Sequence, residues 1–288
     1  MTMRQLLRLT RPHTLSAAVV PVIVGTAAGA LAGRPDFLLA TDMLAISLLL
    51  QIATNMANEY FDFRRGVDHA GLTGIAGVIV QGETSPKAVL AAAAATFALA
   101  FVLGCVLAFA RGPLLVLLGL LSIAIAVLYS AGPRPIAATP FGELTVFMLM
   151  GVLETLVSEV AAVGHLTAAA VAVAPSVGFL VAAILTANNL RDRESDQERG
   201  RRTLAIVLGA ERGLAFLRAE AVLAVVWPAL AALWVLPWPA ALTALLTPLA
   251  LRAGRRGPLR RLLPEVSRLH LLNGLVLSAA LGLYAALR

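Results

Sequence analysis

Two groups of carboxylate and amide side chains stand at the ends of long apolar stretches, and residues of these types can bind cations. The first group consists of Asn55, Asn58, Glu59 and Asp62, followed by Asp68. On an α-helix its first four members lie at positions i, i+3, i+4 and i+7, which places them on one face. The second group consists of Asn189, Asp192 and Asp196, at positions i, i+3 and i+7. We therefore expect two oxygen-rich helix faces.

A hard metal ion is the cofactor that such faces favour. Carboxylates are costly near hydrocarbon unless a cation accompanies them. Mg²⁺ prefers oxygen ligands, retains several waters and commonly joins one or two carboxylates to substrate phosphates. We therefore predict that both groups hold a diphosphate through Mg²⁺, which stabilises the charge on the diphosphate as it leaves. The predicted metal ligands are Asn58, Glu59, Asp62, Asp68, Asp192 and Asp196, and catalysis is assigned to Asp62 and Asp192.

Other polar residues near the two groups are candidates for substrate binding. Basic side chains can neutralise phosphate charge, and the candidates for this task are Arg65, Lys87, Arg191 and Arg202. Tyr129 and the turn that contains Arg134 can position the substrate, and so can the amide side chains of Asn55 and Asn189. The alternative for the acids is that they are solvated loop residues paired with neighbouring arginines.

Three glutamates, Glu143, Glu154 and Glu159, lie inside a predicted membrane segment, where an unpartnered acid is costly. They can line a polar cavity or act as a base, or they can be paired with arginine for structural reasons. Other kinds of site have little support. The 4 histidines lack ligand spacing, and the sequence has no Walker motif, dinucleotide fingerprint or Ser-His-Asp arrangement.

The composition indicates a polytopic membrane protein. Hydrophobic residues make up 59% and charged residues 14% of the 288 residues, whereas soluble domains have about 45–50% and about 25%. A spanning helix needs about 20 mostly apolar residues. We predict an all-α protein with a single domain over 1–288. Its roughly nine transmembrane helices are expected at 14–32, 38–60, 88–110, 113–131, 139–163, 166–188, 214–236, 237–253 and 269–287.

The distribution of charge predicts the orientation of these segments. If the N-terminus is cytoplasmic, all basic residues except Arg34, Arg111 and Arg288 lie at cytoplasmic helix ends, as the positive-inside rule requires. Both acidic groups then face the cytoplasm. The net charge of +7 is explained by topology, so we expect the lipid bilayer as the partner, with no nucleic acid and no obligate protein partner. Cys105 lies in an apolar run and is expected to be buried.

The two acidic groups resemble the paired aspartate-rich motifs of the UbiA superfamily of intramembrane prenyltransferases. The first motif is Asn55-x-x-Asn58-Glu59-x-x-Asp62 with Asp68, and the second is Asp192-x-x-x-Asp196. The branch that prenylates 1,4-dihydroxy-2-naphthoate, the MenA-like branch, is similar at further stretches, which are 11–15, 129–133, 142–144, 188–192 and 202–205. Glu59 departs from the family pattern, which usually has aspartate at this position.

The resemblance implies a helical bundle around a central cavity open to lipid. It implies Mg²⁺-dependent transfer of a polyprenyl group from polyprenyl diphosphate to a lipophilic aromatic acceptor, with 1,4-dihydroxy-2-naphthoate of menaquinone biosynthesis expected first and another acceptor as the alternative. It makes Asn58, Asp62, Asp192 and Asp196 the anchors of Mg²⁺ and diphosphate, assisted by Arg65, Lys87 and Arg202.

An ion-coupled transporter is the rival interpretation of acids in a membrane protein. Transport sites usually lie near the middle of the bilayer, among broken helices. Here the acids end their helices at the predicted cytoplasmic edge, beside arginines that would repel a cation. This location favours the enzyme.

Overall fold

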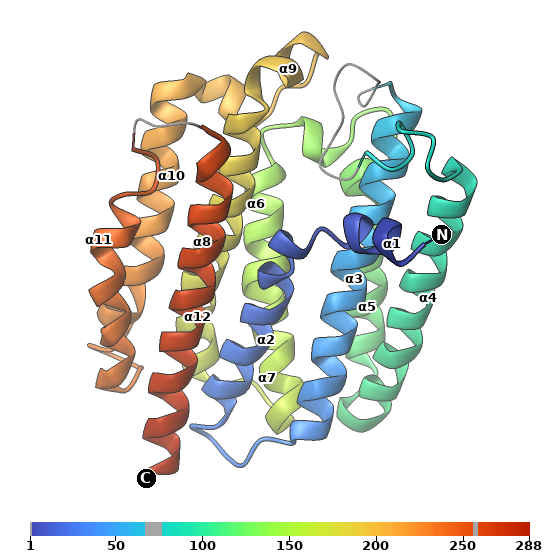
Figure 1. Cartoon of the computed structure of the whole chain (residues 1–288). Helices are drawn as coiled ribbons and strands as arrows, with labels where there is room; N and C mark the ends of the chain where they lie inside the picture. Colours follow the sequence, from blue (N-terminus) through green and yellow to red (C-terminus); the bar gives the residue numbers. More distant parts are fainter. Residues whose placement is uncertain (1, 67–76, 256–258) are drawn as a thin grey trace. The chain divides into compact units, whose positions relative to one another are not determined.

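The computed structural model describes residues 2–66, 77–255 and 259–288, and its regular structure within these ranges is entirely helical (Figure 1). It contains two compact units, each described here by itself. Unit 1 comprises Met1–Leu15 and Asp42–Ala137, and unit 2 comprises Ser16–Thr41 and Ala138–Arg288. The all-α prediction is confirmed, whereas the single domain over 1–288 stays a prediction.

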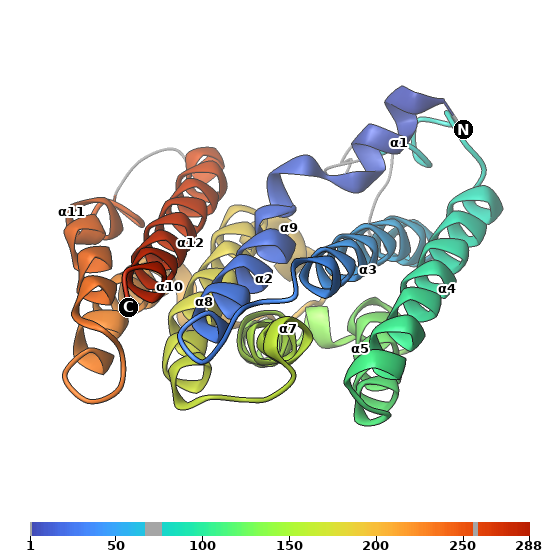
Figure 2. The ribbon, with the colours of Figure 1, turned by 90° about the horizontal axis from the view of Figure 1, so that it is seen from below.

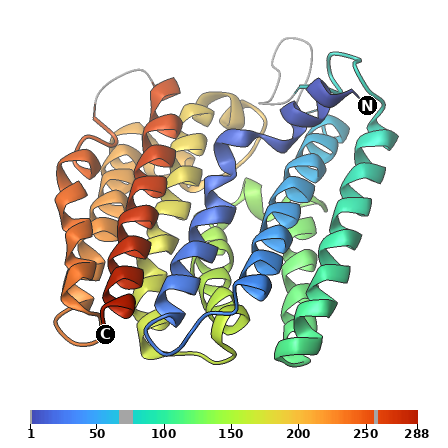
Figure 3. The ribbon, with the colours of Figure 1, turned by 60° about the horizontal axis from the view of Figure 1, so that its bottom comes forward.

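Unit 1 is built on three long helices and a short amphipathic one. Its elements are α1 (Met3–Thr10), η1 (Pro12–Thr14), α3 (Phe37–Arg64, in this unit from Asp42 onward), α4 (Pro86–Arg111) and α5 (Leu114–Ser130). The helices α4 and α5 run side by side (Figure 3). Ser85 caps α4 by accepting a hydrogen bond from the Ala88 N–H, and Pro86 occupies the first turn, where its missing N–H is harmless.

A buried apolar cluster joins α1, the turn after residue 76, α3 and α4. Its members are Leu9, Met56, Val78, Ile79, Val89 and Ala93. The helix α1 begins with a reciprocal capping box between Thr2 and Gln5 and buries Leu9 completely. Outside the cluster, Arg8 pairs with Glu83 and ties α1 to the segment before α4. The N-terminal arginine segment is therefore a docked helix, which the hydropathy pattern did not predict.

Unit 2 is arranged around α8 (Ala168–Arg191), which packs against α2, α10 and α12 (Figure 2). The other elements of this unit are α2 (Ser16–Gly29), η2 at the boundary (Ile136–Ala138), α6 (Gly142–Val146), the π-helix η3 (Phe147–Leu153), α7 (Glu154–Val163), α9 (Arg193–Glu198), α10 (Leu204–Ala231), η4 (Trp238–Leu246), α11 (Thr247–Ala250), η5 (Leu259–Arg261) and α12 (Leu262–Ala286). Its main apolar core lies between α8, α10 and α12.

Glycine allows the backbones of η3 and α8 to touch. A Cβ atom added to Gly151 would lie 2.1 Å from the Gly178 Cα atom, far inside van der Waals contact. Small residues commonly permit such close approach between membrane helices, where packing replaces the hydrophobic effect as the driving force. The contact fixes η3 beside the helix that carries the second acidic group.

Six helices in the described ranges are long and apolar enough to span a membrane. They are Phe37–Arg64, Pro86–Arg111, Gly142–Val163, Ala168–Arg191, Leu204–Ala231 and Leu259–Ala286. Three shorter apolar helices, Ser16–Gly29, Leu114–Ser130 and Trp238–Ala250, match other predicted segments. The protein is thus a multi-pass membrane protein, and the count of nine spans stays a prediction.

The differences from the predicted segments have local causes. The helix α10 begins ten residues earlier than expected and contains a non-helical residue, Gly209, at φ 74°. The proline-rich segment after Pro237 forms the 3₁₀ helix η4 before the short α11, because proline cannot supply backbone donors. Cys105 is exposed on α4, so the expectation that it is buried was wrong.

Candidate functional site

The first acidic group lies on α3, where its members use two adjacent edges of the same face. Asn55 and Glu59 form one edge, and Asn58 and Asp62 form the other, since residues four apart lie nearly above one another. Asn55 is buried and donates from Nδ2 to the Thr10 carbonyl at 3.0 Å and to Thr14 Oγ1 at 3.2 Å. The Asn55 edge therefore docks the segment between α1 and η1, which is a structural task.

Glu59 is almost completely buried, with 1% of its surface exposed. Its carboxylate accepts hydrogen bonds from the backbone N–H groups of Gly77, Val78 and Ile79 at 3.3, 2.7 and 3.3 Å. Arg11 Nη2 lies 3.6 Å from Glu59 Oε2. The assignment of Glu59 as a metal ligand stays a prediction, and in the structure its buried carboxylate is held by backbone N–H groups.

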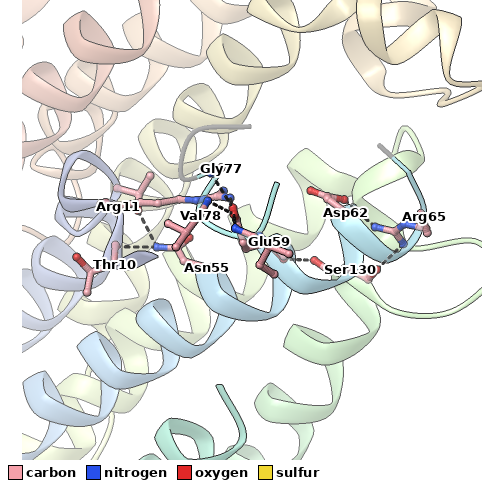
Figure 4. Close-up of polar contacts among 12 residues, drawn as sticks. Thr10, Arg11, Asn55, Glu59, Asp62, Arg65, Gly77, Val78 and Ser130 are labelled. Carbon is pink, nitrogen blue, oxygen red and sulfur yellow. Dashed lines mark hydrogen bonds and ion pairs between the residues drawn. The ribbon is translucent and has the colours of Figure 1, made fainter. Parts of the chain in front are cut away.

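The Asn58–Asp62 edge faces the end of α5 (Figure 4). Ser130 Oγ donates to Asn58 Oδ1, and Arg65 bridges two groups by donating to the Ser130 carbonyl and, at 2.8 Å, to Asp62 Oδ1. Asp62 and Arg65 are both partly exposed. The structure thus brings together Asn58, Asp62 and Arg65 from the predicted set, and it adds Ser130.

The remaining predicted residues of unit 1 are more scattered. Asp68 falls outside the described residues, so its placement as a ligand stays a prediction. Lys87, in the first turn of α4, and Arg134, in the turn after α5, are exposed, whereas Tyr129 is half-buried near the end of α5. Their assignment to substrate binding also stays a prediction.

The second acidic group is divided by a bend. The helix α8 ends at Arg191, Asp192 has φ −94° and ψ 4° at the junction, and α9 carries Asp196. The expectation that Asn189, Asp192 and Asp196 share one face of a single helix was therefore wrong. The chain turns at Asp192, which lies between the two helices and makes no side-chain capping hydrogen bond to α9, so the three side chains are oriented by different local contacts.

Arginines hold the acids of this group. Arg191 donates from Nε and Nη2 to the two carboxylate oxygens of Asp192 at 2.7 and 2.5 Å, and from Nη2 to Asn188 Oδ1 at 2.8 Å. Asp196 is buried and pairs with Arg201 at 3.2 Å. The neighbouring Arg202 is exposed, and its backbone N–H donates to the Ala138 carbonyl.

Deeper along α8, the polar side chains face other helices of unit 2. Asn189 Nδ2 donates to Glu143 Oε1 at 2.9 Å. Glu143 Oε2, Glu220 Oε2 and Thr186 Oγ1 are buried without a hydrogen-bond partner among the described residues. Glu159 accepts from the Thr167 N–H and Oγ1 at 2.8 and 2.5 Å, at the start of α8. Glu143 and Glu159 thus form these hydrogen bonds with neutral groups.

The oxygen donors fit a hard cation that binds together with its substrate. In the described part of the chain, no three His, Cys, Asp or Glu side chains gather closely enough to hold a metal by themselves. Mg²⁺ does not need such a cage, because it usually keeps waters and uses one or two carboxylates plus phosphate oxygens. Each motif offers one amide and one carboxylate as possible ligands, Asn58 with Asp62 and Asn188 with Asp192. An arginine pairs with each of these aspartates.

Sequence reasoning missed several residues that shape these sets. Ser130 and Arg201 contact motif side chains, and Glu220 lies buried in α10 beside α8. A single acid within the apolar 214–236 segment was a visible signal for Glu220. The contacts of Ser130 join residues 65 or more positions apart in the chain, and no spacing rule indicates them.

Fold and site together define a multi-pass helical membrane protein with two motifs rich in oxygen ligands and arginine. The family model described as the UbiA prenyltransferase family matches residues 18–285. The chain therefore belongs to the UbiA prenyltransferase family and is a membrane prenyltransferase. The resemblance found in the paired motifs is confirmed.

Curated relatives carry one recurrent description. The chain is 41% identical over 220 residues to the 1,4-dihydroxy-2-naphthoate octaprenyltransferase of Bacillus subtilis (strain 168), covering 76% of this chain and 71% of the relative. It is 35% identical over 260 residues to the protein of that description from Mycobacterium leprae (strain TN), covering 86% and 85%.

Solved structures share the fold. A UbiA homolog from Archaeoglobus fulgidus bound to GPP and Mg²⁺ has a TM-score of 0.67 and 22% identity, covering 95% of this chain and 99% of that chain. An apo UbiA homolog from Aeropyrum pernix K1 has a TM-score of 0.70 and 21% identity, covering 96% and 98%.

Proposed function

We propose that this membrane prenyltransferase moves a polyprenyl group from polyprenyl diphosphate to 1,4-dihydroxy-2-naphthoate, a step of menaquinone biosynthesis, and that it requires Mg²⁺. The acceptor is inferred from relatives of that description, the first of which is 41% identical to this chain. The metal is inferred from the chemistry of the motifs and from the homolog described with GPP and Mg²⁺.

One structural observation carries the proposal. Two long apolar helices end near an aspartate that is paired with an arginine, Asp62 with Arg65 and Asp192 with Arg191. Carboxylates suit Mg²⁺, and the planar guanidinium suits phosphate oxygens. A cation passenger would be repelled by these arginines, so the arrangement favours binding of an anionic diphosphate over ion transport.

The residues of the two motifs divide the task of binding the diphosphate. We assign Asn58, Asp62, Asp192 and Asp196 to Mg²⁺, with Asp68 as a further candidate, and we leave Glu59 out because its carboxylate is buried and accepts from three backbone N–H groups. Bound Mg²⁺ would draw charge from the leaving diphosphate. Basic side chains would neutralise the remaining phosphate charge, namely those of Arg65, Arg191, Arg202 and Lys87. Asn55 and Asn189 would hold the ends of α3 and α8 in place through their hydrogen bonds to Thr10 and Glu143.

The acceptor must attack an electron-poor allylic carbon after the C–O bond to the diphosphate weakens. Water would compete for that carbon, so a membrane-embedded enzyme that excludes water protects the reaction. Tyr129 and Arg134, near the end of α5, are our candidates for orienting the substrates. We place these groups and the N-terminus on the cytoplasmic side, since nearly all basic residues then obey the positive-inside rule.

Acceptor choice is tested with purified protein in lipid nanodiscs. Labelled polyprenyl diphosphates of several chain lengths are offered with 1,4-dihydroxy-2-naphthoate or with 4-hydroxybenzoate. We expect a prenylated product from the naphthoate and at most traces from the benzoate. Product from the benzoate alone would contradict the proposed acceptor while leaving prenyl transfer intact.

A further inference from the structure

The protein holds the buried carboxylate of Glu59 through three hydrogen bonds and an ion pair. A carboxylate offers about four lone-pair sites; here the N–H groups of Gly77, Val78 and Ile79 donate to it, and the Arg11 guanidinium lies 3.6 Å away as its ion-pair partner. A metal ion bound to this carboxylate would compete with these donors. The displaced N–H groups would then be buried without partners, which is unfavourable.

The donors form a preformed anion site made of backbone. Gly77 adopts φ 59°, in the left-handed region that glycine tolerates, and the three successive N–H groups converge on the carboxylate (Figure 4). Successive N–H groups in such a turn form a concavity that binds anions. Val78 and Ile79 also pack into the apolar cluster with Leu9 and Met56, so this turn is fixed by both packing and charge.

The Arg11 end of α1 is fixed at the same point. Arg11 has φ 49°, an unusual conformation for a residue with a side chain, and it ends α1. Its guanidinium lies against Glu59, while the Thr10 carbonyl accepts from Asn55 one turn earlier on α3. Both contacts lie on one edge of α3, and Asn58 points about 100° away from Glu59 around the helix axis.

We propose that Glu59 is a positioning residue of the first motif and not a ligand of its metal. By fixing α1 and the turn Gly77–Ile79 against one edge of α3, it sets the rotation of that helix and keeps the Asn58–Asp62 edge directed toward Ser130 and Arg65. The metal part of this inference rests on the proposed function, whereas the anchoring part rests on the contacts alone.

Hydrogen exchange on the unmodified full-length protein tests the anchoring without any substitution. The backbone N–H groups of Gly77–Ile79 should exchange slowly, and millimolar Mg²⁺ alone should leave their rate unchanged. Faster exchange at these three positions on adding Mg²⁺ would overturn the proposal, because it would mean that the metal takes the carboxylate from them.

Substitutions distinguish a positioning role of Glu59 from a metal-binding role. Glu59→Gln should accelerate exchange at Gly77–Ile79 by about tenfold or more, whereas Glu83→Gln, which breaks a nearby exposed ion pair, should not. Glu59→Gln should lower kcat by about tenfold to a hundredfold and leave the Mg²⁺ concentration for half-maximal transfer within about twofold of the wild type. A merely structural role would reduce only the amount of folded protein.

Asp62→Asn is the matched comparison on the exposed edge of α3. It should raise the half-maximal Mg²⁺ concentration by about tenfold and leave exchange at Gly77–Ile79 unchanged. A Glu59→Gln protein that behaves like Asp62→Asn in both measurements would overturn the proposal. Absence of prenyl transfer in the wild type would contradict the proposed function, and the exchange measurements would still decide the role of Glu59.

Discussion

Arg191 binds both carboxylate oxygens of Asp192, its neighbour in the chain, with donor distances of 2.7 and 2.5 Å. The pair stands at the bend between α8 and α9, where the long apolar helix ends. A guanidinium that holds the carboxylate in this way is also placed to meet a phosphate bound beside it. Asp62 also pairs with an arginine at the end of α3, but through one oxygen, with 2.8 Å between Arg65 Nη2 and Asp62 Oδ1.

Replacing Arg191 tests whether its planar guanidinium group is needed to bind the polyprenyl diphosphate. We expect Arg191→Lys to raise the KM for polyprenyl diphosphate about tenfold, because lysine retains the charge and loses the two-point geometry. Arg191→Gln should be more severe. Steady-state kinetics in nanodiscs measure this KM, and Arg193→Lys on the adjacent α9 serves as the control, since Arg193 pairs with the exposed Glu194. Equal KM values for Arg191→Lys and the wild type would contradict the assignment.

The contact between Glu143 and Asn189 supports the second motif from within the bundle. Glu143→Ala should lower the free energy of unfolding by about 1–3 kcal/mol, because buried Asn189 Nδ2 then loses its acceptor. Glu143→Gln keeps an acceptor oxygen at the same length and should be milder. Thermal unfolding in detergent measures both variants. An alanine variant as stable as the wild type would show that the contact contributes nothing.

The close backbone packing between η3 and α8 predicts that a larger side chain at Gly151 destabilises the protein through steric overlap alone. Gly151→Val should destabilise the protein by about 1–3 kcal/mol, because its side chain would collide with the backbone of Gly178. Gly104→Val on α4 is the control, since a Cβ there meets nothing within 4 Å. If both variants unfold at the same temperature, the close approach at Gly151 is not as described.

Much of the fold could be predicted from hydropathy, because apolar runs of membrane length dominate this sequence. The same pattern could not reveal α1, which is short and rich in arginine, and it placed the start of α10 ten residues late, since the strongly apolar part of that helix begins only after Arg212. Proline explains why the predicted segment after Pro237 begins as a 3₁₀ helix and does not form one long α-helix.

Helical spacing identified the motif residues, but it could not show that the side chains of one motif have different partners. Helical periodicity places Asn55, Asn58, Glu59 and Asp62 within an arc of about 100°, yet partners distant in sequence divide that arc. The donors to Glu59 come from backbone N–H groups 18 to 20 positions away, and backbone groups leave no mark in the sequence. The bend at Asp192 likewise depends on backbone conformation that side-chain identity does not encode.

The most direct test of the central claim is prenyl transfer to 1,4-dihydroxy-2-naphthoate in nanodiscs, measured with Mg²⁺ and then with excess EDTA, for the wild type, Asp62→Asn and Asp192→Asn. The account predicts transfer by the wild type that EDTA abolishes and added Mg²⁺ restores. Both variants, folded as judged by thermal unfolding, should be slower by about a hundredfold or more, since each loses a charged metal ligand. Transfer that persists in EDTA, or variants as active as the wild type, would contradict it.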